Sequence, residues 1–220
     1  NAIAPLLEGE IYQAENKLDQ ALISYRQAFE KKPSTKALFL ITNILTLQNN
    51  QTEALALLNK ELKKNKKNLA INLKLASIYH QQNDTENAKK HYKSILTMQP
   101  KNALILNNLA WIYHQQNNPK ALNLAKQAYQ ISPESATIAD TYGVILIKQG
   151  NLKQGIDALK KASILAPAIY DIQYHLAEAY ASTGKQKQTI DILKNILSSK
   201  ENFSEKKTAA SLLKNHPSIF

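Results

Sequence analysis

A six-residue segment occurs twice in this chain, at an interval of 34 residues. Residues 78–83 and 112–117 both read Ile-Tyr-His-Gln-Gln-Asn. Three prolines, Pro100, Pro133 and Pro167, keep nearly the same interval. A fixed period of this length is typical of chains that stack one supersecondary unit on the next, so that each unit packs only against its neighbours. The period therefore limits the possible folds more than any other feature of the sequence.

The period divides the chain into six units, residues 3–34, 35–68, 69–102, 103–135, 136–169 and 170–200. The first half of each unit has a small residue, followed three positions later by a large one. The small residues are Gly9, Thr42, Ala76, Ala110, Gly143 and Ala177, and the large ones are Tyr12, Leu45, Tyr79, Tyr113, Leu146 and Tyr180. The second half has the small residues Ala21, Ala54, Ala88, Ala121, Gly155 and Thr189, followed four positions later by the mostly large Tyr25, Leu58, Tyr92, Ala125, Leu159 and Leu193. Spacings of three and four lie on one face of an α-helix, whereas a strand alternates at two. Each unit is thus predicted to be a pair of helices.

The residues between the two halves of each unit favour a helix end. They are Asn16, Asn49, Asn83, Asn117, Gly150 and Gly184, and both residue types tolerate the left-handed conformation that ends many helices. The whole chain has only 5 Gly and 7 Pro, too few for a protein with many β-turns. The predicted fold class is therefore all-α.

A further helix is expected after the sixth unit, within residues 201–220. Ser204 is the predicted N-cap and Pro217 the predicted stop. The apolar residues Ala209, Leu212 and Leu213 would cover the exposed face of the sixth unit, as a terminal cap does in a solenoid. We expect residues 1–2 to be the remnant of a cleaved expression tag.

The order of small residue, tyrosine, glycine or asparagine, alanine, aromatic residue and proline in this frame resembles the tetratricopeptide repeat (TPR). The second unit departs from the pattern, with Thr42 at the small position and Lys66 where proline is usual. The resemblance implies a right-handed superhelical solenoid of six TPR helix pairs plus a C-terminal capping helix. It also implies a non-catalytic scaffold that binds a protein or peptide in a concave groove.

Several segments resemble a narrower group, the TPR-repeat lipoproteins of the PEP-CTERM system of Gram-negative bacteria, in their C-terminal part. These segments are residues 107–113, 121–129, 140–143, 174–177 and 203–213. The resemblance implies a role in envelope protein sorting or exopolysaccharide export, and a periplasmic or outer-membrane-associated location. It further implies that a signal peptide and a lipidated cysteine precede the residues in hand, so that any membrane attachment would come through that N-terminal anchor. A cytoplasmic location, as a regulatory TPR module of a larger enzyme, stays open.

The TPR resemblance also places a binding groove along the first helix of each unit. The groove positions are Lys36, Phe39 and Asn43; Leu73, Ser77 and His80; Asn107, Trp111 and His114; Asp140 and Val144; and Asp171, Tyr174 and Glu178. Trp111 is the only tryptophan, and it is expected either to anchor a partner or to pack between neighbouring first helices. The acids at positions 140, 171 and 178 would favour a basic or N-terminal end of the partner over this half of the groove. A clamp for a C-terminal carboxylate is not expected, because Glu10 would repel it.

The net charge of +11 raises the alternative of an anionic partner, either nucleic acid or a lipid surface. Five lysines and one glutamate fall in residues 60–67. No aromatic residue lies among them to stack on bases, so the segment does not favour nucleic acid as the partner. A solvated helix end is the favoured interpretation of this segment.

Catalysis and metal binding have little support in the sequence. The absence of cysteine excludes a thiol nucleophile and cysteine metal sites within these residues. No HExxH, Walker loop, GxGxxG or GxSxG segment is present. His80 and His114 occupy equivalent positions, which the duplication explains without a shared ion. We therefore expect no enzyme activity, no cofactor, no metal and no small-molecule substrate.

Overall fold

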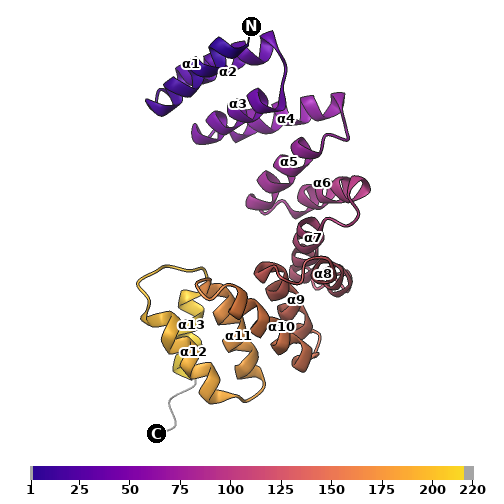
Figure 1. The fold of residues 1–220 in the computed structure, drawn as a ribbon, viewed down its shortest axis with the longest axis vertical. Helices are drawn as coiled ribbons and strands as arrows, with labels where there is room; N and C mark the ends of the chain where they lie inside the picture. Colours follow the sequence, from indigo (N-terminus) through magenta and orange to yellow (C-terminus); the bar gives the residue numbers. More distant parts are fainter. Residues whose placement is uncertain (1, 216–220) are drawn as a thin grey trace. The chain divides into compact units, whose positions relative to one another are not determined.

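The computed structural model describes residues 2–215, and within them every regular element is an α-helix (Figure 1). The first helices of the units are α1 (Ile3–Ala14), α3 (Thr35–Leu47), α5 (Leu69–Gln81), α7 (Ala103–Gln115), α9 (Ala136–Lys148) and α11 (Tyr170–Ser182). The second helices are α2 (Leu18–Lys31), α4 (Gln51–Lys64), α6 (Thr85–Met98), α8 (Lys120–Ile131), α10 (Leu152–Leu165) and α12 (Gln186–Ser198), and α13 (Lys206–Asn215) follows. The prediction of an all-α helical-repeat solenoid is confirmed.

The helices group into two compact units, which divide after Met98. From here on, "first unit" and "second unit" mean these two groups of helices, and each 34-residue repeat is called a helix pair. The first unit holds α1–α6 and the second holds α7–α13. Within each unit every helix packs against the next one along the chain. No helix in residues 2–215 has both the length and the hydropathy needed to cross a bilayer.

All six helix hairpins close in the same way. The backbone φ angle is positive at the six predicted turn residues, Asn16, Asn49, Asn83, Asn117, Gly150 and Gly184, so the predicted left-handed helix ends are confirmed. The amide one residue further on donates to the carbonyl of the large residue in the first helix. These bonds are Lys17 to Tyr12, Asn50 to Leu45, Asp84 to Tyr79, Asn118 to Tyr113, Asn151 to Leu146 and Lys185 to Tyr180, with N···O distances of 2.7–3.0 Å. This 6→1 bond is the Schellman motif, which satisfies a carbonyl left unpaired by the helix end.

The small and large residues interlock between the two helices of a pair. A Cβ atom added at Gly143 on α9 would lie 2.6 Å from Cγ of Leu159 and 3.0 Å from the carbonyl oxygen of Gly155, both on α10. In the first unit, a Cβ at Gly9 would run into the ring of Tyr25, which is fully buried. The small position of the first helix therefore receives the large side chain of the second helix.

The helix α13 covers the last pair, as predicted. Its Ala209 is fully buried in a cluster with Tyr174 and Leu193, and Leu212 and Leu213 pack against that cluster. The helix begins at Lys206, one residue later than the N-cap predicted at Ser204 would require. The reason is that the Ser204 hydroxyl donates to Oδ2 of Asp171, at 3.4 Å, rather than closing the first turn. The stop predicted at Pro217 lies outside the described residues.

Candidate functional site

A cavity of about 400 Å³ opens between three successive first helices of the second unit, α7, α9 and α11, and Leu159 of the second helix α10 also lines it. Its lining residues are His114, Val144, Ile147, Lys148, Leu159, His175, Glu178, Ala179 and Ser182. Three of them, His114, Val144 and Glu178, are predicted groove residues. We call this feature the first-helix cavity.

The first-helix cavity has an aliphatic floor and a polar rim. Leu159 is buried, and Val144 and Ile147 pack in the same core cluster as its side chain. The charged rim residues are Lys148 and Glu178, both exposed. A mainly apolar hollow with a few polar groups at its edge is the usual form of a site that takes one side chain or a small group.

The wall of the cavity contains a histidine–carboxylate pair. Nδ1 of His175 lies 2.9 Å from Oδ1 and 3.0 Å from Oδ2 of Asp140. Burial by itself would lower the pKa of His175. The hydrogen bond and the charge of Asp140, together with Glu178 and Glu205, outweigh the burial and raise the pKa of His175 above its usual value. Asp140, predicted to face a partner, is buried and is engaged by its own chain.

The pair makes the stability of the protein depend on pH. Asp140→Asn is expected to lower the free energy of unfolding by about 1.5–3 kcal/mol at pH 6, the usual value of a hydrogen bond to a charged group, and by less at pH 9. The native state holds the His175 proton more tightly than the unfolded chain does, so the contribution is complete below a pH of about 6.5 and is lost as the pH rises through the raised native pKa. Urea unfolding of both proteins at the two pH values measures the difference. Asp157→Asn, at an exposed carboxylate of α10, is the matched control, and an equal cost of Asp140→Asn at both pH values would contradict the prediction.

Trp111 lies beside the cavity rather than in its lining. The indole is partly exposed, and its ring centroid is 5.4 Å from that of His114, which does line the cavity. Burial, followed by the charges of Lys148 and His175, lowers the pKa of His114, so this imidazole is neutral at neutral pH. Trp111 and His114 thus extend the apolar surface of the cavity along α7.

The other predicted groove residues of the second unit are tied to their own chain or buried. Tyr174 is buried, and its hydroxyl donates to Oε1 of Glu178 at 3.3 Å; burial first, and then the charge of Glu178, raises the pKa of Tyr174. Asn107 is buried, and its Oδ1 has no hydrogen-bond partner. Asp171 accepts from the backbone amide of Glu205 at 3.1 Å and so fixes the start of α13.

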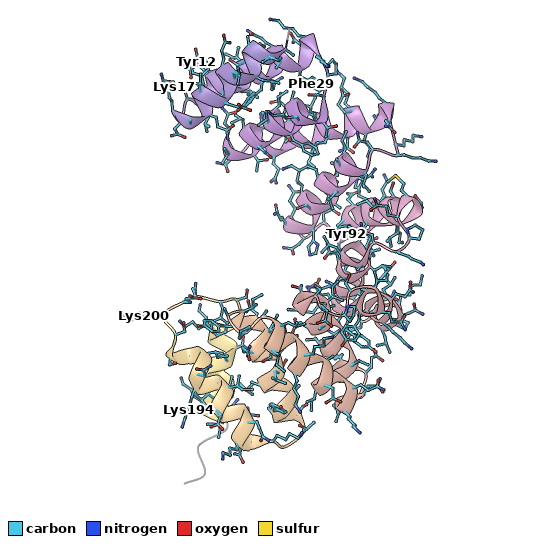
Figure 2. All side chains as sticks on the ribbon, in the orientation of Figure 1. Tyr12, Lys17, Phe29, Tyr92, Lys194 and Lys200 are labelled. Atoms are coloured by element: carbon cyan, nitrogen blue, oxygen red, sulfur yellow. The ribbon has the colours of Figure 1, made fainter. Side chains whose placement is uncertain are left out.

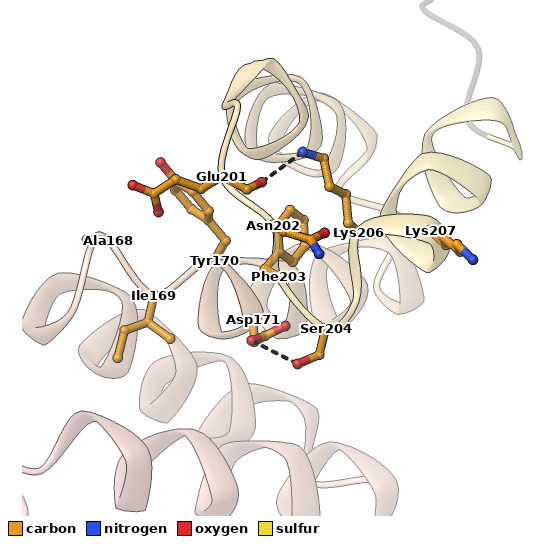
Figure 3. Close-up of a pocket in the computed structure, with 10 residues that line it drawn as sticks. All are labelled: Ala168, Ile169, Tyr170, Asp171, Glu201, Asn202, Phe203, Ser204, Lys206 and Lys207. Atoms are coloured by element: carbon orange, nitrogen blue, oxygen red, sulfur yellow. Dashed lines mark hydrogen bonds between the residues drawn. The ribbon is translucent and has the colours of Figure 1, made fainter. Parts of the chain in front are cut away.

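A larger hollow of about 740 Å³ lies where the α10–α11 and α12–α13 links meet (Figure 3). Two of its polar side chains, Lys206 and Asp171, are engaged by the chain itself. Lys206 donates to the backbone carbonyls of Ser199 and Glu201, at 3.1 and 2.8 Å, and Asp171 receives the Ser204 hydroxyl. Tyr170 and Phe203 pack edge to face across it, with centroids 5.7 Å apart. The arrangement holds the capping helix in place.

In the first unit, the predicted groove residues form two separate groups. Phe39 and Asn43 of α3 are joined by Lys74 of α5, which donates to Oδ1 of Asn43 at 2.7 Å and lies 5.9 Å from the Phe39 ring centroid. Leu73 and Ser77 are exposed on α5.

His80 is the last of the predicted groove residues on α5, and its side chain contacts α6, the second helix of the same pair. Its Nδ1 lies 3.3 Å from the hydroxyl of Tyr92 on α6, which is labelled in Figure 2. At the other end, Lys36 is paired with Glu10, with Nζ 3.0 Å from Oε1. Within residues 2–215 no group of three or more His, Asp or Glu side chains could hold a metal ion.

Sequence reasoning missed His175 and Lys148, because they do not occupy the usual groove positions of a TPR first helix. A signal for His175 was present. Asp140 and His175 are separated by 35 residues, close to one repeat, so complementary side chains fall next to each other on neighbouring first helices. In a repeat sequence, an acidic and a basic residue about one period apart can therefore indicate an ion pair between neighbouring first helices.

Two family models, both describing the tetratricopeptide repeat, match residues 6–68 and 67–134, together more than half of the chain. Many solved structures share the fold, and three of them are described next. A TPR protein from Parabacteroides merdae superposes with a TM-score of 0.80 at 18% identity, over 97% of this chain and 86% of that one. PilF of Pseudomonas aeruginosa superposes with a TM-score of 0.73 at 14% identity, over 97% of this chain and 95% of that one. YrrB, described as a TPR protein with an unusual peptide-binding site, gives 0.64 at 17% identity, over 87% and 97%. A comparison with curated proteins gave no match. From the repeat frame, the uniform hairpins and the family models, the chain belongs to the tetratricopeptide-repeat family.

Proposed function

We propose that this protein is a non-catalytic scaffold that holds a peptide segment of a partner protein against the first helices of its second unit. TPR domains generally bind proteins or peptides. The observation that carries the proposal is the first-helix cavity, because three successive repeats contribute to it and its floor is aliphatic. An aliphatic side chain of the peptide would enter the cavity, and Trp111 would cover the neighbouring residue of the peptide.

The charges of the site refine the expected partner. Of the three acids predicted in this half of the groove, Asp140 is paired with His175 and Asp171 accepts the amide of Glu205. Glu178 is the exposed one, and Lys148 lies on the same rim. A peptide with an aliphatic anchor and a single basic group beside it suits this rim better than a strongly basic segment does.

The proposal predicts that Trp111→Ala weakens peptide binding at least tenfold, since a large aromatic group at the centre of a contact commonly contributes about 2 kcal/mol. Peptides selected from a random display library on the wild-type protein are the probe, and their affinities are measured by fluorescence anisotropy. Ile131→Ala, an exposed aliphatic side chain on the second helix α8, is the matched control and is expected to leave the affinities unchanged. Peptides that bind Trp111→Ala as tightly as the wild type would remove Trp111 from the site.

The envelope setting is a separate part of the proposal. Its support is the sequence resemblance of residues 107–113, 121–129 and 203–213 to the PEP-CTERM TPR lipoproteins. The natural coding sequence upstream of residue 3 tests it, together with fractionation of the native cells. A lipoprotein signal and recovery in the membrane fraction would support the envelope role, whereas an upstream catalytic domain would favour a regulatory module of a cytoplasmic enzyme.

A further inference from the structure

A second hollow of about 400 Å³ lies in the first unit, where α4, α5 and α6 meet. It is lined by Asn59, Leu62, Lys63, Lys66, Asn72, Lys90, His91 and Ser94. Three of these residues are lysines and none is acidic. We call it the lysine hollow, and it is separate from the first-helix cavity and its proposed function.

The three lysines come from three different elements. Lys63 is in the last turn of α4, Lys66 is in the link to α5, and Lys90 is in the middle of α6. The dipole of α4 accounts for a lysine at its C-terminus, but it gives no reason for one at position 90. The tertiary fold therefore gathers positive charge that the sequence segment 60–67 alone does not explain.

The neighbouring acids do not neutralise this charge. Glu61 is paired with Lys64, with Nζ 2.7 Å from Oε1, and Glu86 is paired with Lys89 at 2.6 Å. Both of these lysines lie outside the lining of the hollow. Lys63, Lys66 and Lys90 have no ion pair among the described residues, so the hollow concentrates three uncompensated cations.

A buried histidine forms the inner wall of the lysine hollow. His91 is 5% exposed and stacks on Tyr79, with centroids 5.7 Å apart and planes 6° from parallel. Its Nδ1 lies 3.0 Å from Oδ1 of Asn72. The amide nitrogen of Asn72 donates to the carbonyls of Lys66 and Asn68, at 3.1 and 2.9 Å, which fixes Oδ1 as the atom facing the ring. Nδ1 of His91 must therefore carry a hydrogen, and Nε2 is left as the nitrogen for a ligand.

The state of Nε2 defines the kind of ligand. Burial, and then the charge of Lys90, lowers the pKa of His91, so the ring is neutral at neutral pH and Nε2 is a hydrogen-bond acceptor. An oxyanion that also carries an O–H group would satisfy both the lysines and this acceptor. Inorganic phosphate keeps an O–H in a large fraction of its molecules at neutral pH, whereas sulfate has none. A phosphomonoester has a second pKa of about 6, so only its minor monoanion carries an O–H at this pH.

We infer that the lysine hollow binds a phosphate group, either free phosphate or a phosphomonoester. Lys63, Lys66 and Lys90 supply charge-assisted hydrogen bonds to its oxygens, and the Ser94 hydroxyl adds a neutral donor. The P–OH group donates to Nε2 of His91. No covalent step is involved.

The test is isothermal titration of the full chain with sodium phosphate at constant ionic strength. The triple variant Lys63→Gln, Lys66→Gln, Lys90→Gln removes the three lining charges. The matched control, Lys60→Gln, Lys67→Gln, Lys93→Gln, removes three exposed charges from the same helices and link outside the hollow. We expect the Kd for phosphate to rise at least tenfold in the first variant and less than twofold in the control.

Two results would overturn the inference. Equal weakening in both triple variants would mean that phosphate responds only to diffuse positive charge, and a wild-type chain that does not bind phosphate would exclude the site. Sulfate is expected to bind at least fivefold more weakly than phosphate, and equal affinity would contradict the role of His91. Phenyl phosphate separates the two sources when both affinities are expressed per concentration of the form that carries a P–OH group. On that scale, binding as tight as that of inorganic phosphate identifies a monoester site, and much weaker binding identifies a site for the free ion.

Discussion

Gly143→Val is expected to destabilise the second unit by about 3 kcal/mol, the upper part of the range for adding atoms to a packed core. The first added carbon would already lie 2.6 Å from Cγ of Leu159 and 3.0 Å from the carbonyl oxygen of Gly155. Leu159 is 1% exposed, and the clash falls on Cγ, the branch point of its side chain, so rotating a terminal methyl group cannot relieve it. The Gly155 carbonyl is part of the α10 backbone, so relief requires the two helices to separate.

Urea unfolding followed by circular dichroism measures this loss, with Gly143→Ala as an intermediate case. Alanine adds the same first carbon, but its better helix propensity returns up to about 1 kcal/mol. Thr137→Val, an exposed position on the same helix, controls for the β-branched side chain and is expected to change stability by less than about 0.5 kcal/mol. Unchanged stability in Gly143→Val would show that α9 and α10 are not in close contact at this point.

Tyr25→Ala is expected to cost the first unit about 3–5 kcal/mol, as the truncation of a buried aromatic side chain usually does. Tyr25 is fully buried, and its ring fills the space left by Gly9 on α1. It also packs in a cluster with Ile41 and Leu45 of the next pair, so its loss opens a void between α1, α2 and α3. Solenoid repeats depend on their neighbours, so we expect α1 and α2 to lose protection from hydrogen exchange first.

Tyr25→Phe distinguishes the free-energy cost of the void from the cost of the lost hydrogen bond. The Tyr25 hydroxyl donates to Oε1 of Gln13 at 2.8 Å, and its removal is expected to cost about 0.5–1.5 kcal/mol. Hydrogen exchange of the α1 and α2 amides, read by mass spectrometry, gives both values. A Tyr25→Phe cost as large as that of Tyr25→Ala would mean that the hydrogen bond, rather than packing, stabilises this pair.

The helices and their turns could be predicted from the sequence because the same local pattern of small, large and turn residues occurs six times. Each turn residue at 16, 49, 83, 117, 150 and 184 has the positive φ angle that its asparagine or glycine suggested. The start of α13 was harder to predict, because it depends on Asp171, which is 34 positions before Glu205 in the chain. An N-cap rule applied to Ser204 considers only neighbouring residues in the sequence, so it does not include such a distant partner.

The candidate sites were less predictable than the fold. The groove positions of a TPR first helix led to His114, Val144 and Glu178, but the pairing of Asp140 with His175 depends on how two repeats meet. The lysine hollow could not be predicted from the sequence for a similar reason. Residues 60–67 suggested a solvated helix end, and Lys90 and His91 join them only through the packing of α6 against α5.

The closure of every hairpin through main-chain atoms has a consequence for the engineering of binding specificity and for sequence divergence among repeats. The amide–carbonyl bond after each left-handed residue involves no outward-facing side chain. Exchange of the outward residues of one first helix for those of another should therefore leave the loop geometry intact. New specificities can be grafted onto this backbone one helix at a time, provided that the interlocking glycines, alanines and leucines stay in place.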